Sequence, residues 1–160
     1  MTQYSFKQNQ LTLSVAKSSL FVRGTLFVFA GLFFMAPISS ILFSVISGKG
    51  FHMGFMVMLF LFSIMGYYLL RIALWNTFGK EVITFNNNRL TYLADYGWFK
   101  DALKSKEIEP LQYSIRRIGF EEDQKGALVI GDEGNNIQCA TKMKTAELNE
   151  LISQLKTMNK

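Results

Sequence analysis

The sequence is poor in the residues on which covalent cross-linking and metal binding usually depend. Its 160 residues include one cysteine, Cys139, and one histidine, His52. A single cysteine excludes an intramolecular disulfide, which is typical of a protein in a reducing compartment. A single histidine also excludes a zinc site built on two histidines.

Acidic residues are absent from the first 75 positions. All 12 acidic residues lie in residues 76–160, where an equal number of basic residues balances them. The excess behind the formal charge of +5 therefore comes from Lys7, Lys17, Arg23, Lys49 and Arg71, which flank or adjoin apolar segments. A nucleic-acid-binding protein needs a basic patch on its soluble part, so we expect no nucleic-acid partner.

Charge is also absent from two long apolar segments. Residues 24–46 would extend about 34 Å as a helix, and residues 53–70 about 27 Å. We predict membrane spans over about 23–46 and 52–75, with Arg71 reaching the headgroups. A signal peptide has a shorter apolar core followed by a cleavage site. A buried helix of a soluble protein is the other alternative, but two such segments in succession favour spans.

The connector Ser47–Gly50 is too short to fold, so residues 20–75 are predicted to form an antiparallel transmembrane hairpin. Basic residues gather before the first span and after the second, whereas the connector holds only Lys49. The positive-inside rule then places both termini in the cytoplasm. This topology also separates His52 from Cys139 and excludes a Cys–His nucleophile pair.

Three small residues recur every fourth position in the first span: Ala36, Ser40 and Ser44. Small side chains let helices approach closely in a membrane. This stripe is expected to pack against the second span or, alternatively, against a partner protein.

Residues 76–160 are predicted to form a cytoplasmic domain of short strands and one helix. In Arg89–Tyr96 the residues Leu90, Tyr92 and Ala94 share one face of a strand. The other predicted strands are Glu81–Phe85, Leu103–Glu109 and Gln112–Phe120, separated at Pro110, and the hairpin Ala127–Ile130 with Asn136–Ala140. Leu148, Leu151, Ile152 and Leu155 then follow the spacing of an amphipathic helix.

The N-terminal segment, residues 1–19, is predicted to be cytoplasmic. Apolar and polar residues alternate in residues 10–16, where Leu11, Leu13 and Val15 share one face. This segment is either a strand that joins the distant C-terminal sheet or a disordered tail.

The segment Leu74–Thr84, with the sequence LWNTFGKEVIT, resembles a junction found in small bacterial membrane proteins with two helices and a C-terminal pleckstrin-homology-like domain, which are mostly of unknown function. Ser105-Lys106-Glu107 and the helix that begins near Ala146 also fit that pattern. Cys139-Ala140-Thr141 departs from it, because the family more often has an aromatic-glycine pair there. The resemblance implies an α+β membrane protein of the bacterial inner membrane, in which a PH-like antiparallel sheet or partial barrel is closed by one C-terminal helix.

Several residues are candidates for contacts with lipid or protein. Arg71, Lys80 and Arg89 are candidate contacts for anionic headgroups. Trp98 and Phe99, at a predicted loop tip, are expected to anchor the domain to an interface or partner, or to pack in its core. Arg116 and Arg117 fall on opposite faces of a strand, so they cannot both line one site.

Two acidic loops, Glu121–Asp123 and Asp132-Glu133, either hold a divalent cation or are solvated turns. We favour turns and expect no metal, cofactor or catalytic residue. The expected function is a non-catalytic, membrane-anchored module that binds a protein partner. An accessory subunit of a membrane complex would be one form of such a module. The alternatives are an anionic-lipid sensor, an immunity protein that protects the membrane, and, as the weakest, a metal-dependent enzyme.

Overall fold

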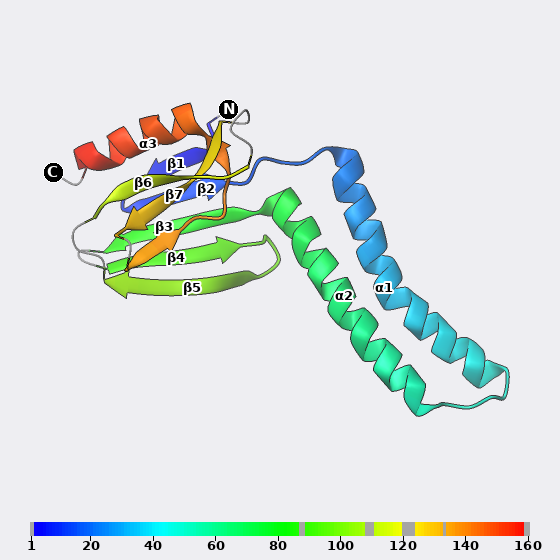
Figure 1. Cartoon of the computed structure of the whole chain (residues 1–160). Helices are drawn as coiled ribbons and strands as arrows, with labels where there is room; N and C mark the ends of the chain where they lie inside the picture. The colour runs from blue at the N-terminus through cyan, green and yellow to red at the C-terminus, as the bar shows by residue number, and fades with distance from the viewer. Residues whose placement is uncertain (1, 87–88, 108–110, 120–123, 133, 159–160) are drawn as a thin grey trace. The chain divides into compact units, whose positions relative to one another are not determined.

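The computed structural model has an α+β fold with two compact units (Figure 1). It describes residues 2–86, 89–107, 111–119, 124–132 and 134–158. One unit comprises Lys17–Thr77, and the other combines Met1–Ala16 with Phe78–Lys160. Each unit is described by itself. The described chain contains two long apolar helices, antiparallel strands and a C-terminal helix, as the sequence predicted. The strands form two sheets, whereas the prediction was a single sheet or partial barrel.

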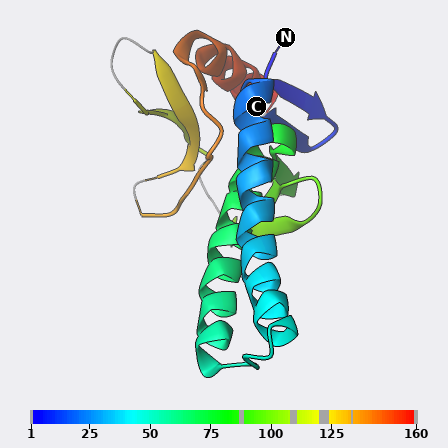
Figure 2. The ribbon, with the colours of Figure 1, turned by 90° about the vertical axis from the view of Figure 1, so that its right-hand side faces the viewer.

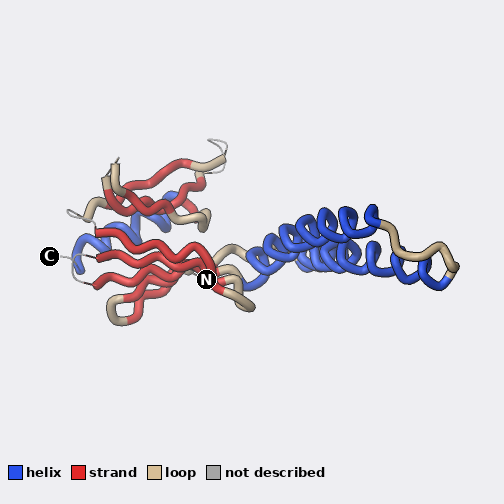
Figure 3. The backbone as a smooth tube through the Cα atoms, turned by 90° about the horizontal axis from the view of Figure 1, so that it is seen from below, coloured by secondary structure: helices blue, strands red, loops and turns tan. Residues whose placement is uncertain are grey.

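The helical unit contains α1 (Leu20–Ile46) and α2 (Met53–Phe78). Both are long and apolar enough to cross a membrane. The first begins three residues before the predicted span, and the second ends three residues after it. The helices run side by side (Figures 2 and 3). Ser19 caps α1 by accepting a hydrogen bond from the Val22 amide at 3.3 Å. Gly48 and Gly50 have positive φ angles, which lets the short connector reverse the chain.

One stripe of α1 is buried: Ala30, Pro37 and Ser44, which are seven residues apart. Seven residues fall only about 20° short of two helical turns, so this spacing stays on one face. On α2, Gly66 is buried where the Phe34 ring approaches, and the Phe33 and Phe62 rings lie 5.4 Å apart. The helices thus meet through aromatic rings that pack on small residues.

The predicted small-residue stripe is wrong as a contact within the hairpin. Ala36 and Ser40 are exposed, and only Ser44 is buried. A four-residue spacing advances by about 40° around the helix at each step, so it leaves the contact face. The Ser44 hydroxyl donates a hydrogen bond to the Gly50 carbonyl at 3.0 Å and so joins α1 to the connector. Whether Ala36 and Ser40 contact a partner protein stays a prediction.

In the other unit, five strands form sheet A, in which every neighbouring pair is antiparallel. The order is β1 (Tyr4–Lys7), β2 (Gln10–Ser14), β3 (Lys80–Asn86), β4 (Arg89–Asp95) and β5 (Lys100–Glu107). The alternating N-terminal segment is thus a strand, β2, and not a tail. Its ladder with β3 runs from Gln10 opposite Thr84 to Ser14 opposite Lys80.

The β2–β3 pairing has a direct consequence for the chain path. The whole helical hairpin is an insertion between two neighbouring strands of one sheet (Figure 1). The Val15 amide donates to the Gly79 carbonyl at 3.0 Å, so the chain leaves the sheet and returns to it at the same place.

Sheet B has the order β6 (Tyr113–Arg117), β7 (Lys125–Gly131) and β8 (Asn136–Gln138), and β9 (Met143–Lys144) pairs with the start of β7. The strands β1 and β9 were not predicted. The predicted ends Ile108, Glu109 and Phe120, together with the break at Pro110, lie outside the described residues.

The helix α3 (Thr145–Met158) packs on sheet B and buries the predicted stripe, Leu148, Leu151, Ile152 and Leu155. The predicted face of β4 is confirmed too, because Leu90, Tyr92 and Ala94 are all buried. The two sheets are joined at one corner, where the Lys106 ammonium donates to the Asn136 carbonyl at 3.1 Å and the Asn135 amide group donates to the Glu107 carbonyl at 2.6 Å.

Gly66 gives a test of the helix contact. A Cβ at this position would lie 2.9 Å from Cε2 of Phe34, whereas one at Gly31 meets nothing within 4 Å. We expect Gly66→Leu to destabilise the hairpin by about 1–3 kcal/mol, the usual cost of overpacking. Unfolding by SDS titration in mixed micelles measures this, with Gly31→Leu as the matched control. Equal effects of the two substitutions would contradict the contact.

Candidate functional site

A carboxylate lies in the interior of the sheet unit. Glu81 on β3 is fully buried and accepts hydrogen bonds from the Tyr92 hydroxyl at 2.5 Å, the Ala140 amide at 2.6 Å and the Thr141 amide at 2.9 Å. A buried carboxylate is costly unless it is hydrogen-bonded, and three donors meet that need here. Glu81 therefore ties sheet A to the segment that follows β8.

Burial and this carboxylate also determine the chemistry of the neighbouring side chains. Burial, and then the charge of Glu81, raises the pKa of the Cys139 thiol well above its usual value. The same two causes raise the pKa of the Tyr92 hydroxyl. Both groups thus keep their protons at neutral pH, and a protonated thiol is a poor nucleophile. The arrangement is suited to holding the sheets together and not to covalent catalysis.

Sequence reasoning missed Glu81, although the signal was present. In an alternating strand, Glu81 has the same parity as Ile83, which is also fully buried. A carboxylate at an inward-facing position indicates a buried hydrogen-bonding partner. In the same region the Thr141 hydroxyl oxygen is buried and has no hydrogen-bond partner within the described residues.

Two of the three predicted headgroup contacts, Lys80 and Arg89, are not brought together. Lys80 pairs with Asp95 at one end of the β3–β4 ladder, and Arg89 pairs with Asn86 at the other, about 20 Å away at the usual rise of a strand. Arg89 forms an exposed salt bridge with Glu107 at 3.0 Å. The third candidate, Arg71, lies in α2 of the helical unit and is partly buried there.

Trp98 and Phe99 occupy the turn between β4 and β5, where they have different surroundings. The Phe99 ring is half-buried and stacks on the Tyr96 ring with a centroid distance of 4.7 Å. The Trp98 side chain is 71% exposed. Gly97, with a φ of +87°, makes the turn tight, and its amide donates to the Asp95 carboxylate at 2.8 Å. The turn thus presents one large aromatic side chain to its surroundings.

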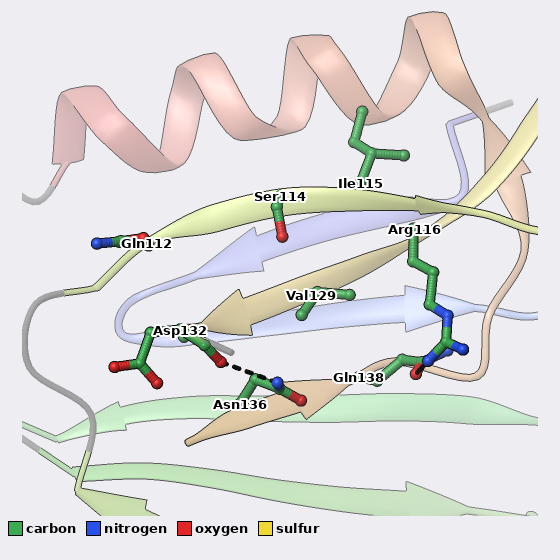
Figure 4. A pocket seen from close by; sticks show the side chains of 9 residues that line it. Gln112, Ser114, Ile115, Arg116, Val129, Asp132, Asn136 and Gln138 are labelled. Atoms are coloured by element: carbon green, nitrogen blue, oxygen red, sulfur yellow. Dashed lines mark hydrogen bonds between the residues drawn. The ribbon is translucent and has the colours of Figure 1, made fainter. Parts of the chain in front are cut away.

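The outer face of sheet B carries an open groove of about 630 Å³ (Figure 4). Ser114 and Arg116 on β6 point into it, away from α3, whereas Ile115 between them points toward the helix. Val129 lies on β7, between β6 and β8. Gln138 on β8 accepts a hydrogen bond from the Arg116 guanidinium at 2.7 Å.

Nine residues line this groove, and four of them have amide or hydroxyl side chains. The lining is completed by Gln112, Gly131, Asp132 and Asn136. The Asn136 side chain donates to the Asp132 carbonyl at 2.9 Å, which holds the turn that closes one end. We call this surface the sheet B groove. Its lining offers donors and acceptors on rigid strands, which is the chemistry that binds a polypeptide main chain.

The acidic loops offered no test of the cation hypothesis. Glu121–Asp123 and Glu133 lie outside the described residues. Among the residues that are described, no group of three or more His, Cys, Asp or Glu side chains is placed to hold a metal ion.

The buried carboxylate yields the next prediction. Glu81→Ala leaves the Tyr92 hydroxyl and the Thr141 amide buried without this acceptor, and each such group costs about 1–3 kcal/mol. Glu107→Ala, which removes only an exposed salt bridge, should change the free energy of unfolding by about 0–1 kcal/mol. Chemical denaturation of the two variants measures the difference. If Glu81→Ala is as mild as Glu107→Ala, the carboxylate does not hold the sheets together.

Comparison with known proteins adds no relative to this description. No protein-family model matches the chain, and neither a search of curated proteins nor one of solved structures finds a match. The resemblance to small bacterial membrane proteins therefore stays a prediction that rests on the residues of the Leu74–Thr84 segment.

Proposed function

We propose that the chain is an integral membrane protein in which α1 and α2 cross the bilayer as a hairpin. Helices of 27 and 26 residues extend about 40 Å, more than the roughly 30 Å of a hydrocarbon core. Large apolar side chains are exposed along both helices, among them Phe29, Phe43, Phe60 and Leu61. A water-soluble protein rarely leaves so much apolar surface uncovered, and lipid would cover it.

The observation that carries this proposal is the insertion of the hairpin between β2 and β3. Because Ser14 and Lys80 are paired neighbours, the first helix starts and the second ends next to the same strand pair. A hairpin that crosses a bilayer twice satisfies this constraint, whereas a single crossing cannot. Lys7 and Lys17 precede the hairpin and Arg23 lies in the first turn of α1, whereas the connector holds only Lys49. This distribution favours a cytoplasmic location for both termini at a bacterial inner membrane.

For the sheet unit we propose a PH-like domain that acts as a non-catalytic, protein-binding module. Two antiparallel sheets with one C-terminal helix agree with that fold. The sheet B groove is the proposed contact surface, because its amide and hydroxyl side chains can hydrogen-bond an extended segment of a partner protein. Anchoring by the hairpin keeps this surface at the membrane.

Labelling of single cysteines tests the topology. In a Cys139→Ala background, Thr2→Cys and Lys142→Cys should react with a membrane-impermeant maleimide only after the cells are lysed. Lys49→Cys should react in intact spheroplasts, because the connector would face the periplasm. Reaction of positions 2 and 142 from opposite sides of the membrane would overturn the proposed hairpin.

Photocross-linking in cells tests the partner surface. A photoreactive amino acid at Ser114, which lines the groove, should cross-link one defined protein, and the same probe at Ser153, exposed on α3, should not. Adding Val129→Lys, which puts a charge between the groove strands, should abolish the cross-link from Ser114. An identical pattern from both probe positions, or insensitivity to Val129→Lys, would contradict the groove as the contact surface.

A further inference from the structure

The exposed Trp98 lies on a turn that packs against Phe78, the residue at which the second segment of the sheet unit begins. A Cβ on Gly97 would come within 2.8 Å of the Phe78 Cβ, so the turn and Phe78 are in direct contact inside the sheet unit. Phe78 is also the last residue of α2. If α2 spans a bilayer, its last residue lies close to the headgroups, and a turn that touches Phe78 lies close to them as well.

Two basic residues stand at the same end of sheet A. Lys80 opens β3, Lys100 opens β5, and both are opposite Asp95 in the register of the sheet. Both lysines are exposed. The Asp95 carboxylate between them accepts a hydrogen bond from the Gly97 amide within the turn. This end of the sheet thus combines an exposed indole with two ammonium groups.

We infer that the turn Tyr96–Lys100, together with Lys80, binds the headgroup region of an anionic bilayer. Trp98 would lie at the interface with its ring among the upper acyl chains, the position in which tryptophan is enriched in membrane proteins. Lys80 and Lys100 would bind headgroup phosphates. This inference rests on the proposed membrane insertion and adds a second contact, which fixes the orientation of the sheet unit against the bilayer.

Lipid fits this surface better than a protein partner does. A tryptophan is usually well buried in a folded chain, so an indole that is 71% exposed on a tight turn calls for a covering phase. The covering phase nearest to Phe78, along the chain, is the bilayer that α2 would enter. Two contacts hold the turn closed. The Tyr96 and Phe99 rings stack on each other, and the Tyr96 amide donates a hydrogen bond to the Phe99 carbonyl at 2.9 Å.

The sequence provides its own probes, since its two tryptophans are Trp75 in α2 and Trp98 in the turn. The full-length Trp75→Phe variant reports only on Trp98, and Trp98→Phe reports only on Trp75. Each is placed in lipid nanodiscs that contain phosphatidylglycerol. We expect Trp98 emission to be quenched by lipids with a doxyl group near the headgroup, and its quenching by aqueous acrylamide to be several-fold weaker than in the urea-unfolded chain.

Charge removal then tests the basic pair. Lys80→Ala with Lys100→Ala, or phosphatidylcholine in place of phosphatidylglycerol, should raise acrylamide quenching of Trp98 several-fold. Lys104→Ala with Lys125→Ala, which removes the same charge elsewhere, should leave it unchanged. Acrylamide is neutral, so the charge changes do not alter its local concentration.

The outcomes separate the two proposals. If lipid quenches Trp75 but not Trp98, the turn does not bind the bilayer, although the hairpin is embedded. If lipid quenches neither tryptophan, the proposed membrane insertion itself fails. If Trp98 is quenched by lipid regardless of the lysines and of lipid charge, the role of Lys80 and Lys100 in binding anionic headgroups is wrong.

Discussion

The ladder between β2 and β3 is the interaction on which the rest of the structure depends. It joins a short N-terminal strand to the first strand after the helices, and the whole hairpin lies between these two strands in sequence. Closing so long a loop costs entropy, and two fully buried leucines, Leu11 and Leu13, offset that cost by packing under the sheet. Without β2, the strand β3 would be an open sheet edge beside an unfilled core.

A second constraint acts inside the sheet unit. Glu81 gathers donors from β4 and from the segment after β8, so the two sheets share one buried polar contact as well as an apolar core. Apolar contacts tolerate sliding, whereas a carboxylate that must satisfy three donors admits one arrangement. This contact therefore fixes how sheet A meets the segment after β8.

Sequence patterns predicted the elements whose periodicity is long or clear. The two apolar helices, the alternating face of β4 and the leucine stripe of α3 each follow from local spacing. The strands β1 and β9 were missed because four and two residues are too few to show a period, and pairing partners distant in sequence define them. The small-residue stripe failed for a geometric reason, since a four-residue repeat drifts around the helix while the true contact repeats every seven.

The arrangement of the candidate site residues is harder to predict from the sequence, because it depends on tertiary structure. Trp98 and Phe99 are adjacent in sequence, but only the stacking of Phe99 on Tyr96 shows that one ring belongs to the fold and the other to the surface. Lys80 and Arg89 are close in sequence, and the strand between them sets them at opposite ends of the sheet. No local pattern reveals the groove, because its walls come from three strands and the turn between two of them.

The insertion of the hairpin also orders the assembly of the chain during synthesis. The ribosome makes β2 before α1, yet its partner β3 emerges only after α2 is complete. The edge of β2 that pairs with β3 therefore lacks its partner while both helices are made, although β1 can already pair with the other edge. A chain whose second helix failed to return would keep β2 and β3 apart. Sheet A can therefore form completely only after the two helices have formed the hairpin.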